Sequence, residues 1–155
     1  MFFSTLLLAG LVSLTVALPT SSSIESRAGG PIARPIPSTC TVTNPLPTAE
    51  SSMTYQPGPS TAGALMYYAY YSSYTTSTTQ MQQQCFEQCY GFGDSTQCKT
   101  AYWAQNLTVP AGYYGSPGGN LEIGCLFFNR TLTTGDFEAA LAGQAVGAYA
   151  GNIQC

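Results

Sequence analysis

Short runs of apolar and aromatic residues, separated by stretches of Gly, Ser and Thr, are concentrated in the part of the chain that follows residue 60. Residues 65–71 predict a strand, because tyrosine favours pleated surfaces, with an amphipathic segment as the alternative. The runs 100–104 and 121–128 predict buried strands, and 136–141 predicts one more. A long loop containing Gly and Pro, residues 106–120, is expected between the first two of these.

One segment has helical character instead. Hydroxyl residues precede a stretch rich in Gln and Met, and a glycine follows it, so a helix is predicted over residues 79–90. Cys85 and Cys89 are four residues apart, which places both sulfur atoms on one helix face. That face must pack against the elements that carry the cysteine partners. The elements together predict a small α+β domain with one helix on a short antiparallel sheet.

The N-terminal region has a different composition. Residues 1–18 form an uncharged apolar run that ends in small residues, as in a secretory signal peptide, and the run is shorter than the ~20 residues that span a bilayer. Residues 19–60 hold eight of the ten prolines and many Ser and Thr. They predict an extended, O-glycosylated linker or propeptide, pinned to the domain at Cys40 and with Arg27 as a candidate processing site. The folded domain is then expected over residues 61–155.

Composition narrows the possible partners. Only 7% of residues are charged, the net charge is −3 and histidine is absent. Nucleic acid and anionic membrane surfaces are therefore not expected partners, because both require a basic surface. No second apolar run has membrane-spanning length, so the predicted product is secreted and extracellular or associated with the cell wall. The sequons at Asn106 and Asn129 predict N-glycosylation.

The six cysteines are expected to form disulfides rather than a metal site. Export leads to an oxidising compartment, and the chain has neither histidine nor the paired CxxC motifs of structural zinc sites. A cysteine nucleophile would also lack a histidine base. We therefore expect no metal and no cofactor. Six cysteines allow many connectivities, so their spacing does not define the pairs.

Carboxylates offer the remaining route to catalysis. Asp136 and Glu138 lie two apart on a predicted strand, so they would share one face like a glycosidase pair. The simpler interpretation is a pair of solvated strand residues, because catalysis would need a pocket around them. The glycine-rich residues 115–119 are not followed by a lysine or a helical pattern, so we interpret them as a turn and not as a phosphate site. We expect no catalytic residues.

Aromatic residues provide the better functional hypothesis. Tyr113 and Tyr114 lie in the long loop between glycines, where burial is difficult, and they predict a ligand-binding loop. Aromatic residues elsewhere can serve either the core or a recognition surface, and both interpretations stay open. They are Tyr67, Tyr68, Tyr70, Tyr71, Tyr102 and Trp103.

The cysteines and the strands around them also form an ordered set of features. The set comprises a helix with Cys85 and Cys89, a short loop to Cys98 before an aromatic strand, the strand residues 124–128, and residues 136–138 with a Gly-rich tail. Over residues 67–151 this set resembles the PAN/apple-like domains of secreted fungal proteins. The resemblance implies a helix tied to the sheet by nested bridges and a further bridge between the termini. The implied pairs are Cys85–Cys125, Cys89–Cys98 and Cys40–Cys155.

The resemblance also implies a function. Apple-like domains mediate protein–protein or protein–carbohydrate contacts, so we expect a non-catalytic binding module. Its partner would be an extracellular protein or glycan, and its role adhesion or contact at the cell wall or host interface, including that of a candidate effector. The alternatives are a structural protein of the cell wall or spore surface and a secreted hydrolase that uses Asp136 and Glu138. The sequence carries no signal for an oligomeric state.

Overall fold

The computed structural model describes residues 30–48 and 53–155. The predicted signal peptide over residues 1–18 and the candidate processing site at Arg27 lie outside the described residues. Within them the chain forms a small α+β domain with one main helix on an antiparallel sheet. The predicted fold class is confirmed at that level.

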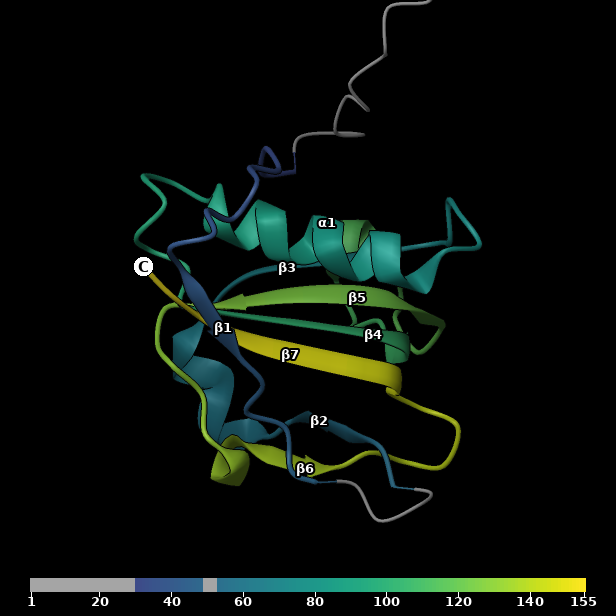
Figure 1. The fold of residues 1–155 in the computed structure, drawn as a ribbon. Coiled ribbons are helices and arrows are strands. Elements are labelled where there is room, and N and C mark those ends of the chain that lie inside the picture. The colour runs from purple at the N-terminus through teal and green to yellow at the C-terminus, as the bar shows by residue number, and fades with distance from the viewer. Residues whose placement is uncertain (1–29, 49–52) are drawn as a thin grey trace, which may run out of the picture.

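A five-stranded antiparallel sheet lies at the centre of the described part (Figure 1). Its order is β1 (Thr41–Thr43), β7 (Val146–Gln154), β4 (Thr100–Thr108), β5 (Leu121–Phe128) and β3 (Leu65–Tyr71). Strands β4 and β5 lie in the interior of the sheet, and their side chains are buried over most of their length in the cores on its two faces. Strands β1 and β3 form the two edges.

The sheet is covered on both faces. Helix α1 (Thr78–Tyr90) lies on one face, and the antiparallel pair β2 (Tyr55–Pro57) and β6 (Phe137–Ala139) lies on the other (Figure 1). Successive side chains of a strand point to opposite faces, so Trp103 belongs to the core under the helix and Tyr102 to the core over β6. Two hydrophobic cores therefore share one sheet.

Helix α1 follows the sequence prediction closely. The Ser77 hydroxyl accepts a hydrogen bond from the Gln80 N–H at 3.3 Å and caps the first turn. At the other end, the Gly91 N–H donates to the Glu87 carbonyl. The buried side chains Met81, Cys85, Phe86 and Cys89 form one stripe along the helix. The predicted common face for Cys85 and Cys89 is thus the face that contacts the sheet.

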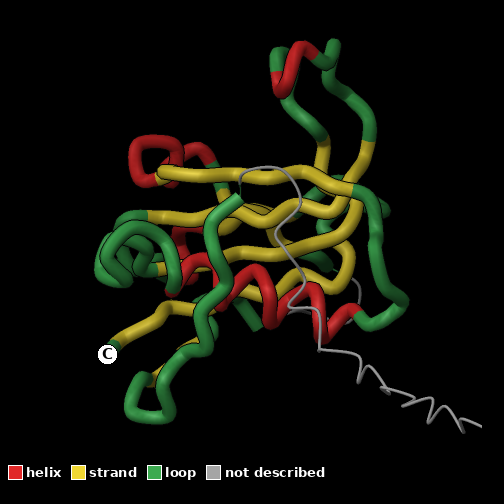
Figure 2. The backbone as a smooth tube through the Cα atoms, turned by 90° about the horizontal axis from the view of Figure 1, so that it is seen from above, coloured by secondary structure: helices red, strands yellow, loops and turns green. Residues whose placement is uncertain are grey.

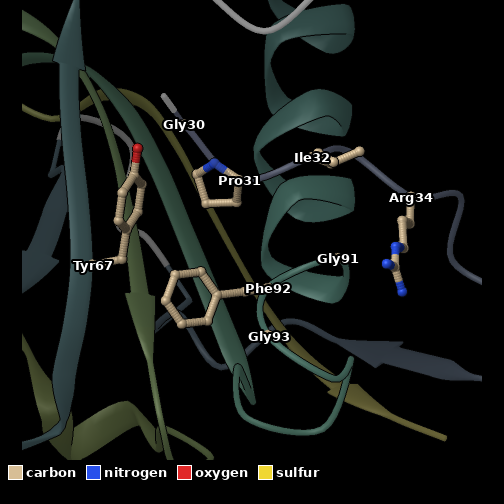
Figure 3. Close-up of a pocket in the computed structure, with 8 residues that line it drawn as sticks. All are labelled: Gly30, Pro31, Ile32, Arg34, Tyr67, Gly91, Phe92 and Gly93. Atoms are coloured by element: carbon tan, nitrogen blue, oxygen red, sulfur yellow. The ribbon is translucent and has the colours of Figure 1, made fainter. Parts of the chain in front are cut away.

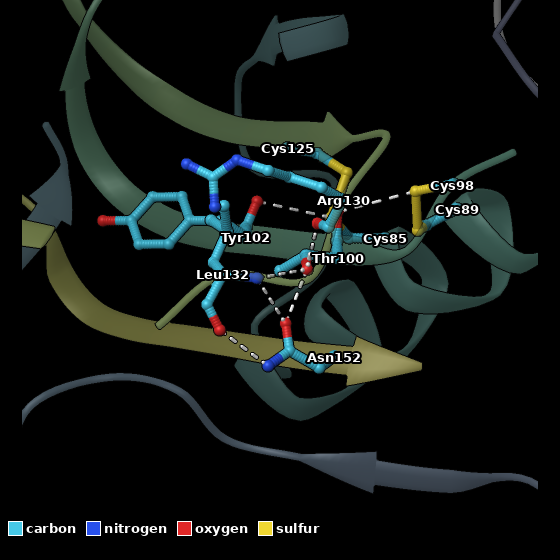
Figure 4. Close-up of a disulfide and its surroundings, with 9 residues drawn as sticks. All are labelled: Cys85, Cys89, Cys98, Thr100, Tyr102, Cys125, Arg130, Leu132 and Asn152. Atoms are coloured by element: carbon cyan, nitrogen blue, oxygen red, sulfur yellow. Dashed lines mark hydrogen bonds between the residues drawn. A yellow bond between two sulfur atoms is a disulfide. The ribbon is translucent and has the colours of Figure 1, made fainter. Parts of the chain in front are cut away.

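Three disulfides pair all six cysteines. Two tie the helix to the sheet region, Cys85–Cys125 to β5 and Cys89–Cys98 to the segment before β4 (Figure 4). The third joins Cys40, just before β1, to Cys155, just after β7. These are the pairs that the family resemblance implied.

The buried side-chain amide of Asn152 attaches the segment after β5 to strand β7. The Asn152 Nδ2 donates to the Leu132 carbonyl at 2.9 Å, and the Asn152 Oδ1 accepts from the Leu132 N–H at 3.1 Å (Figure 4). The Asn152 side chain of β7 therefore bonds both backbone groups of Leu132, as a neighbouring strand would. Every buried side-chain nitrogen and oxygen in the described residues has a hydrogen-bond partner.

The linker predicted over residues 19–60 is corrected for the described part of that segment. Residues 30–48 and 53–60 belong to the domain: β1 pairs with β7, β2 pairs with β6, and the Arg34 N–H donates to the Glu87 carbonyl at 2.9 Å. A Cβ added at Gly91 would overlap the Ile32 carbonyl oxygen, so this segment crosses closely over the end of α1. Its prolines are tolerated because an edge strand and an extended crossing need few backbone donors.

Strands 65–71 and 121–128 are confirmed, and the other predicted boundaries change. The strand predicted over 100–104 continues to Thr108, which shortens the following loop to residues 109–120. Of the strand predicted over 136–141, only β6 (Phe137–Ala139) is observed. Residue 136 belongs to a 3₁₀ turn, η3 (Thr134–Asp136), and residues 140–141 follow the end of β6.

Strand β7 lies in the segment that the sequence pattern left as a Gly-rich tail. Its small residues fit a position beneath the helix: a Cβ added at Gly151 would overlap the ring of Phe86. Close packing therefore removed the apolar alternation by which strands are recognised.

Candidate functional site

Four tyrosines form a continuous aromatic surface at the β3 edge of the sheet, which we call the tyrosine surface. Tyr68 and Tyr70 come from β3, and Tyr113 and Tyr114 come from η2 (Tyr113–Gly115) in the loop between β4 and β5. The ring centroids are 4.7 Å apart for Tyr113 and Tyr114, 5.1 Å for Tyr70 and Tyr113, and 5.7 Å for Tyr68 and Tyr113. Tyr113 is thus the central ring of the group.

The sheet positions one half of this surface. Residues two apart on a strand share a face, so Tyr68 and Tyr70 lie side by side with their ring centroids 6.0 Å apart. They lie on the edge strand, where no further strand covers them in the described part of the chain. Tyr68 is 43% exposed, whereas Tyr70 also packs against the core over β6.

The β4–β5 loop supplies the other half and projects beyond the end of the sheet (Figure 2). The Tyr113 phenol oxygen accepts a hydrogen bond from the Tyr70 N–H at 2.9 Å. It also lies 3.4 Å from the Tyr70 carbonyl oxygen, to which the hydroxyl donates. These contacts attach the loop to the edge of β3.

Tyr114 has the most exposed large side chain on this surface. Its side chain is 89% exposed, and its backbone is left-handed with φ 46° and ψ 36°. That conformation costs a bulky residue on the order of 1–3 kcal/mol, and such strain clusters at ligand-binding and active sites. A glycine or asparagine would adopt this conformation more easily. The exposed aromatic ring at residue 114 is therefore present in spite of a cost in stability.

Two hollows border Tyr67, and the first of them adjoins the tyrosine surface. One has a volume of about 300 Å³ and is lined by Met66, Tyr67, Tyr68, Gly112, Tyr113 and Tyr114, none of which carries a formal charge. The other, of about 390 Å³, lies between β3 and the end of α1, where the rings of Pro31, Tyr67 and Phe92 line it and Arg34 extends away from those rings (Figure 3). Tyr67 borders both hollows.

The remaining predicted aromatic residues belong to the cores. Tyr102 and Trp103 are fully buried, and Tyr71 accepts a hydrogen bond from the Trp103 Nε1 at 3.1 Å. Burial raises the pKa of the Tyr71 phenol to about 12, although the bond from Trp103 opposes the shift. Burial likewise raises the pKa of Tyr102. These phenols stay protonated and serve packing.

The two carboxylates do not form the predicted pair on one strand. Asp136 lies in η3 and is buried, whereas Glu138 lies on β6, is exposed, and accepts a hydrogen bond from the Gln56 Nε2 at 3.0 Å. The strand alternation that would align them is therefore interrupted between the two residues. The prediction of a shared strand face is wrong at Asp136.

Asp136 instead has a structural environment. Arg130 binds it in a bidentate manner, with N–O distances of 2.6 Å and 2.9 Å, and the Thr133 N–H and the Ser60 hydroxyl donate to the same carboxylate. The hydrogen bonds from Arg130 and then from the Thr133 N–H hold the pKa of Asp136 well below its usual range. Both oxygens of the Asp136 carboxylate accept hydrogen bonds from other residues of the domain, and these bonds hold η3 against the segment after β5.

Both sequon asparagines are exposed. Asn106 lies on β4 in a left-handed conformation, and its Nδ2 donates to the Gly143 carbonyl at 3.0 Å. Asn129 follows β5, and its backbone N–H donates to the Ala64 carbonyl. Exposure is the condition that N-glycosylation places on a folded site.

In the described residues, no cluster of three or more His, Cys, Asp or Glu residues could hold a metal ion. The same part of the chain contains no helix with the length and hydropathy of a membrane span. Comparisons with protein-family models, curated proteins and solved structures found no match to this chain.

Proposed function

We propose that this protein is a secreted, non-catalytic binding module whose tyrosine surface contacts an extracellular protein or carbohydrate. The site of action would be the cell wall or a host interface, in the manner of a candidate effector. The observation that carries the proposal is Tyr114, which presents an 89% exposed ring from a left-handed backbone on a projecting loop. An exposed aromatic residue in a strained conformation is difficult to explain by packing.

The surroundings of Tyr114 support a recognition role. Tyrosine rings give large, rigid contact areas with a polar end, and they are enriched at interfaces. The hollow of about 300 Å³ beside Tyr113 and Tyr114 offers a place for one side chain or sugar ring of a partner. Its uncharged lining favours a partner that is neutral at the contact.

The PAN/apple-like family and secretion are parts of the same proposal. Three disulfides are consistent with an oxidising compartment, and the bridges from α1 to the sheet region agree with the arrangement that the resemblance implies. N-glycans at Asn106 and Asn129 would project from exposed positions on β4 and after β5.

The test is a binding screen of the secreted protein against immobilised glycans, insoluble wall polysaccharides and extracellular proteins. For each ligand found, Tyr114→Ala is expected to weaken binding roughly tenfold or more, the scale of an aromatic hot spot. Leu141→Ala is the matched control, because Leu141 is a 71% exposed apolar residue that does not line either hollow. Equal binding by wild type and Tyr114→Ala would remove the tyrosine surface as the site.

The screen also separates the alternatives. Tight retention in the wall fraction that neither competing glycans nor Tyr114→Ala reduces would favour a structural wall protein. Hydrolysis of a wall polysaccharide that is lost in Glu138→Gln would favour a hydrolase.

A further inference from the structure

The tyrosines of this chain differ widely in access to solvent. Tyr114 is 89% exposed, whereas Tyr68, Tyr74 and Tyr149 are 43%, 43% and 40% exposed, and Tyr102 is fully buried. Tyr114 also stands on the loop that projects beyond the sheet. Its phenol is therefore the one that a second large molecule reaches with least obstruction among the described tyrosines.

Tyr114 is also connected to other phenols. It contacts Tyr113, which contacts Tyr70 and Tyr68, with successive ring centroids 4.7 to 5.7 Å apart. An electron or a hydrogen atom passes readily between phenols at such separations. A radical formed on Tyr68, Tyr70 or Tyr113 can therefore pass to Tyr114 along this series of ring contacts.

We infer that Tyr114 is the site at which two copies of this protein become covalently joined by oxidative phenol coupling. The oxidant is hydrogen peroxide, used by an extracellular haem peroxidase. This inference does not rest on the proposed binding function, because it concerns the chemistry of the exposed phenol alone.

The chemistry balances as follows. The peroxidase removes one electron and one proton from each of two Tyr114 phenols, and the two electrons and two protons reduce one hydrogen peroxide to two waters. The two phenoxyl radicals then join through the ring carbons next to the oxygens. The hydrogen on each joined carbon moves to the adjacent oxygen, which restores both phenols as dityrosine.

The structure favours an intermolecular product at this position. Tyr113 is held by its hydrogen bonds to Tyr70, and its ring meets that of Tyr114 at 70°, a nearly edge-on arrangement that does not align their coupling carbons face to face. The low charge of the chain, −3 overall, adds little repulsion between two copies. Phenols in the core, such as Tyr102, are enclosed and cannot meet a second molecule.

The test treats the purified full chain with a haem peroxidase and hydrogen peroxide. We expect dityrosine fluorescence together with a dimer that survives reducing, denaturing electrophoresis, and peptide mapping should place the link at Tyr114 of both copies. Tyr114→Phe removes one exposed oxygen and should abolish the dimer. Tyr149→Phe is the matched control, because it also loses one partly exposed phenol. It should form dimer at the wild-type rate, since Tyr114 is intact in this variant.

The same experiment can overturn the inference. Undiminished dimer in Tyr114→Phe, or links mapped to Tyr68 or Tyr74, would exclude Tyr114 as the coupling site. Fluorescence without dimer would show coupling within one chain, between Tyr113 and Tyr114, and would also contradict the proposal. Circular dichroism of both variants establishes that their folds are equal before the comparison is made.

Discussion

The phenol oxygen of Tyr113 lies 2.9 Å from the backbone nitrogen of Tyr70, so a side chain from the β4–β5 loop bonds the outer edge of strand β3. An edge strand normally presents unpaired N–H and C=O groups that can pair with other chains. Here the hydroxyl bonds both groups of Tyr70. The contact protects the edge and orders the loop that presents Tyr114.

This contact predicts the effect of removing one oxygen. Tyr113→Phe should destabilise the domain by about 0.5–1.5 kcal/mol, the net value of a typical hydrogen bond. Amide hydrogen exchange at Tyr70 should become faster, because its N–H loses its partner. Tyr114→Phe is the control, since the structure records no hydrogen bond from that exposed hydroxyl among the described residues. Unchanged exchange at Tyr70 in Tyr113→Phe would contradict the role of the contact.

Asp136 predicts a stability that depends on pH. Arg130 and Thr133 lower the pKa of Asp136 in the folded state, so the folded state binds this proton more weakly than the unfolded state. The resulting stabilisation is complete above the unfolded pKa of about 3.9 and is lost progressively as the pH falls below it. Urea denaturation at several pH values from about 2 to about 7 should show this decline in the free energy of unfolding.

Two variants isolate that contribution. Asp136→Asn should cost roughly 1–3 kcal/mol at neutral pH, because it leaves the partners of a buried carboxylate partly unpaired, and its acid decline should be shallower. Arg130→Lys keeps the charge but loses the bidentate geometry, so it should be intermediate. If the acid decline of Asp136→Asn equals that of the wild type, another carboxylate causes it.

The disulfides should differ in their contributions. The sequence separation is 115 for Cys40–Cys155 and 9 for Cys89–Cys98. On the chain-entropy model a loop of ~100 residues contributes about 4.7 kcal/mol, and one shorter than ~15 residues contributes less than about 3 kcal/mol. Replacing both cysteines of a pair with Ala should therefore cost more for the first bridge than for the second. Guanidinium denaturation measures both, and the reverse order would show that native packing at Cys89, not loop closure, dominates.

Strand β7 predicts a steric effect at Gly151. A Cβ there would overlap the ring of Phe86 and come too close to the Val42 side chain, so Gly151→Ala should destabilise by about 1–3 kcal/mol through overpacking. Gly63→Ala is the control, because its Cβ would meet no atom within 4 Å. It should be neutral or slightly stabilising. A shift in thermal midpoint of similar size and sign for both would mean that backbone entropy, not contact with Phe86, determines the result.

Local signals explain which elements could be predicted from the sequence. Helix α1 has a hydroxyl cap, a polar face and a terminal glycine, and β5 is a long apolar run, so each is defined by its own residues. Strand β1 is a short, exposed strand whose partner β7 follows more than a hundred residues later. Only that long-range pairing and the Cys40 bridge give β1 its structure, and neither can be inferred from a local pattern.

The candidate site divides in the same way. Tyr113 and Tyr114 could be selected because glycines and a long loop surround them. The contribution of Tyr68 depends on which strand lies at the edge of the sheet, and that is a property of the fold. The strand interpretation of Asp136 missed a local signal, because Thr133 and Asp136 have the spacing of a capping box and that box begins the 3₁₀ turn η3. The hydrogen bond from Ser60 to Asp136 is a long-range contact, and no local pattern indicates it.

The bridge between Cys40 and Cys155 has a mechanical consequence. It joins residues at the outer ends of the paired strands β1 and β7, so tension applied at these two cysteines passes through a single covalent bond. The hydrogen bonds of the sheet between them carry none of that load. The tyrosine surface lies at the opposite edge of the sheet, so this bridge secures the edge that is farthest from those tyrosines.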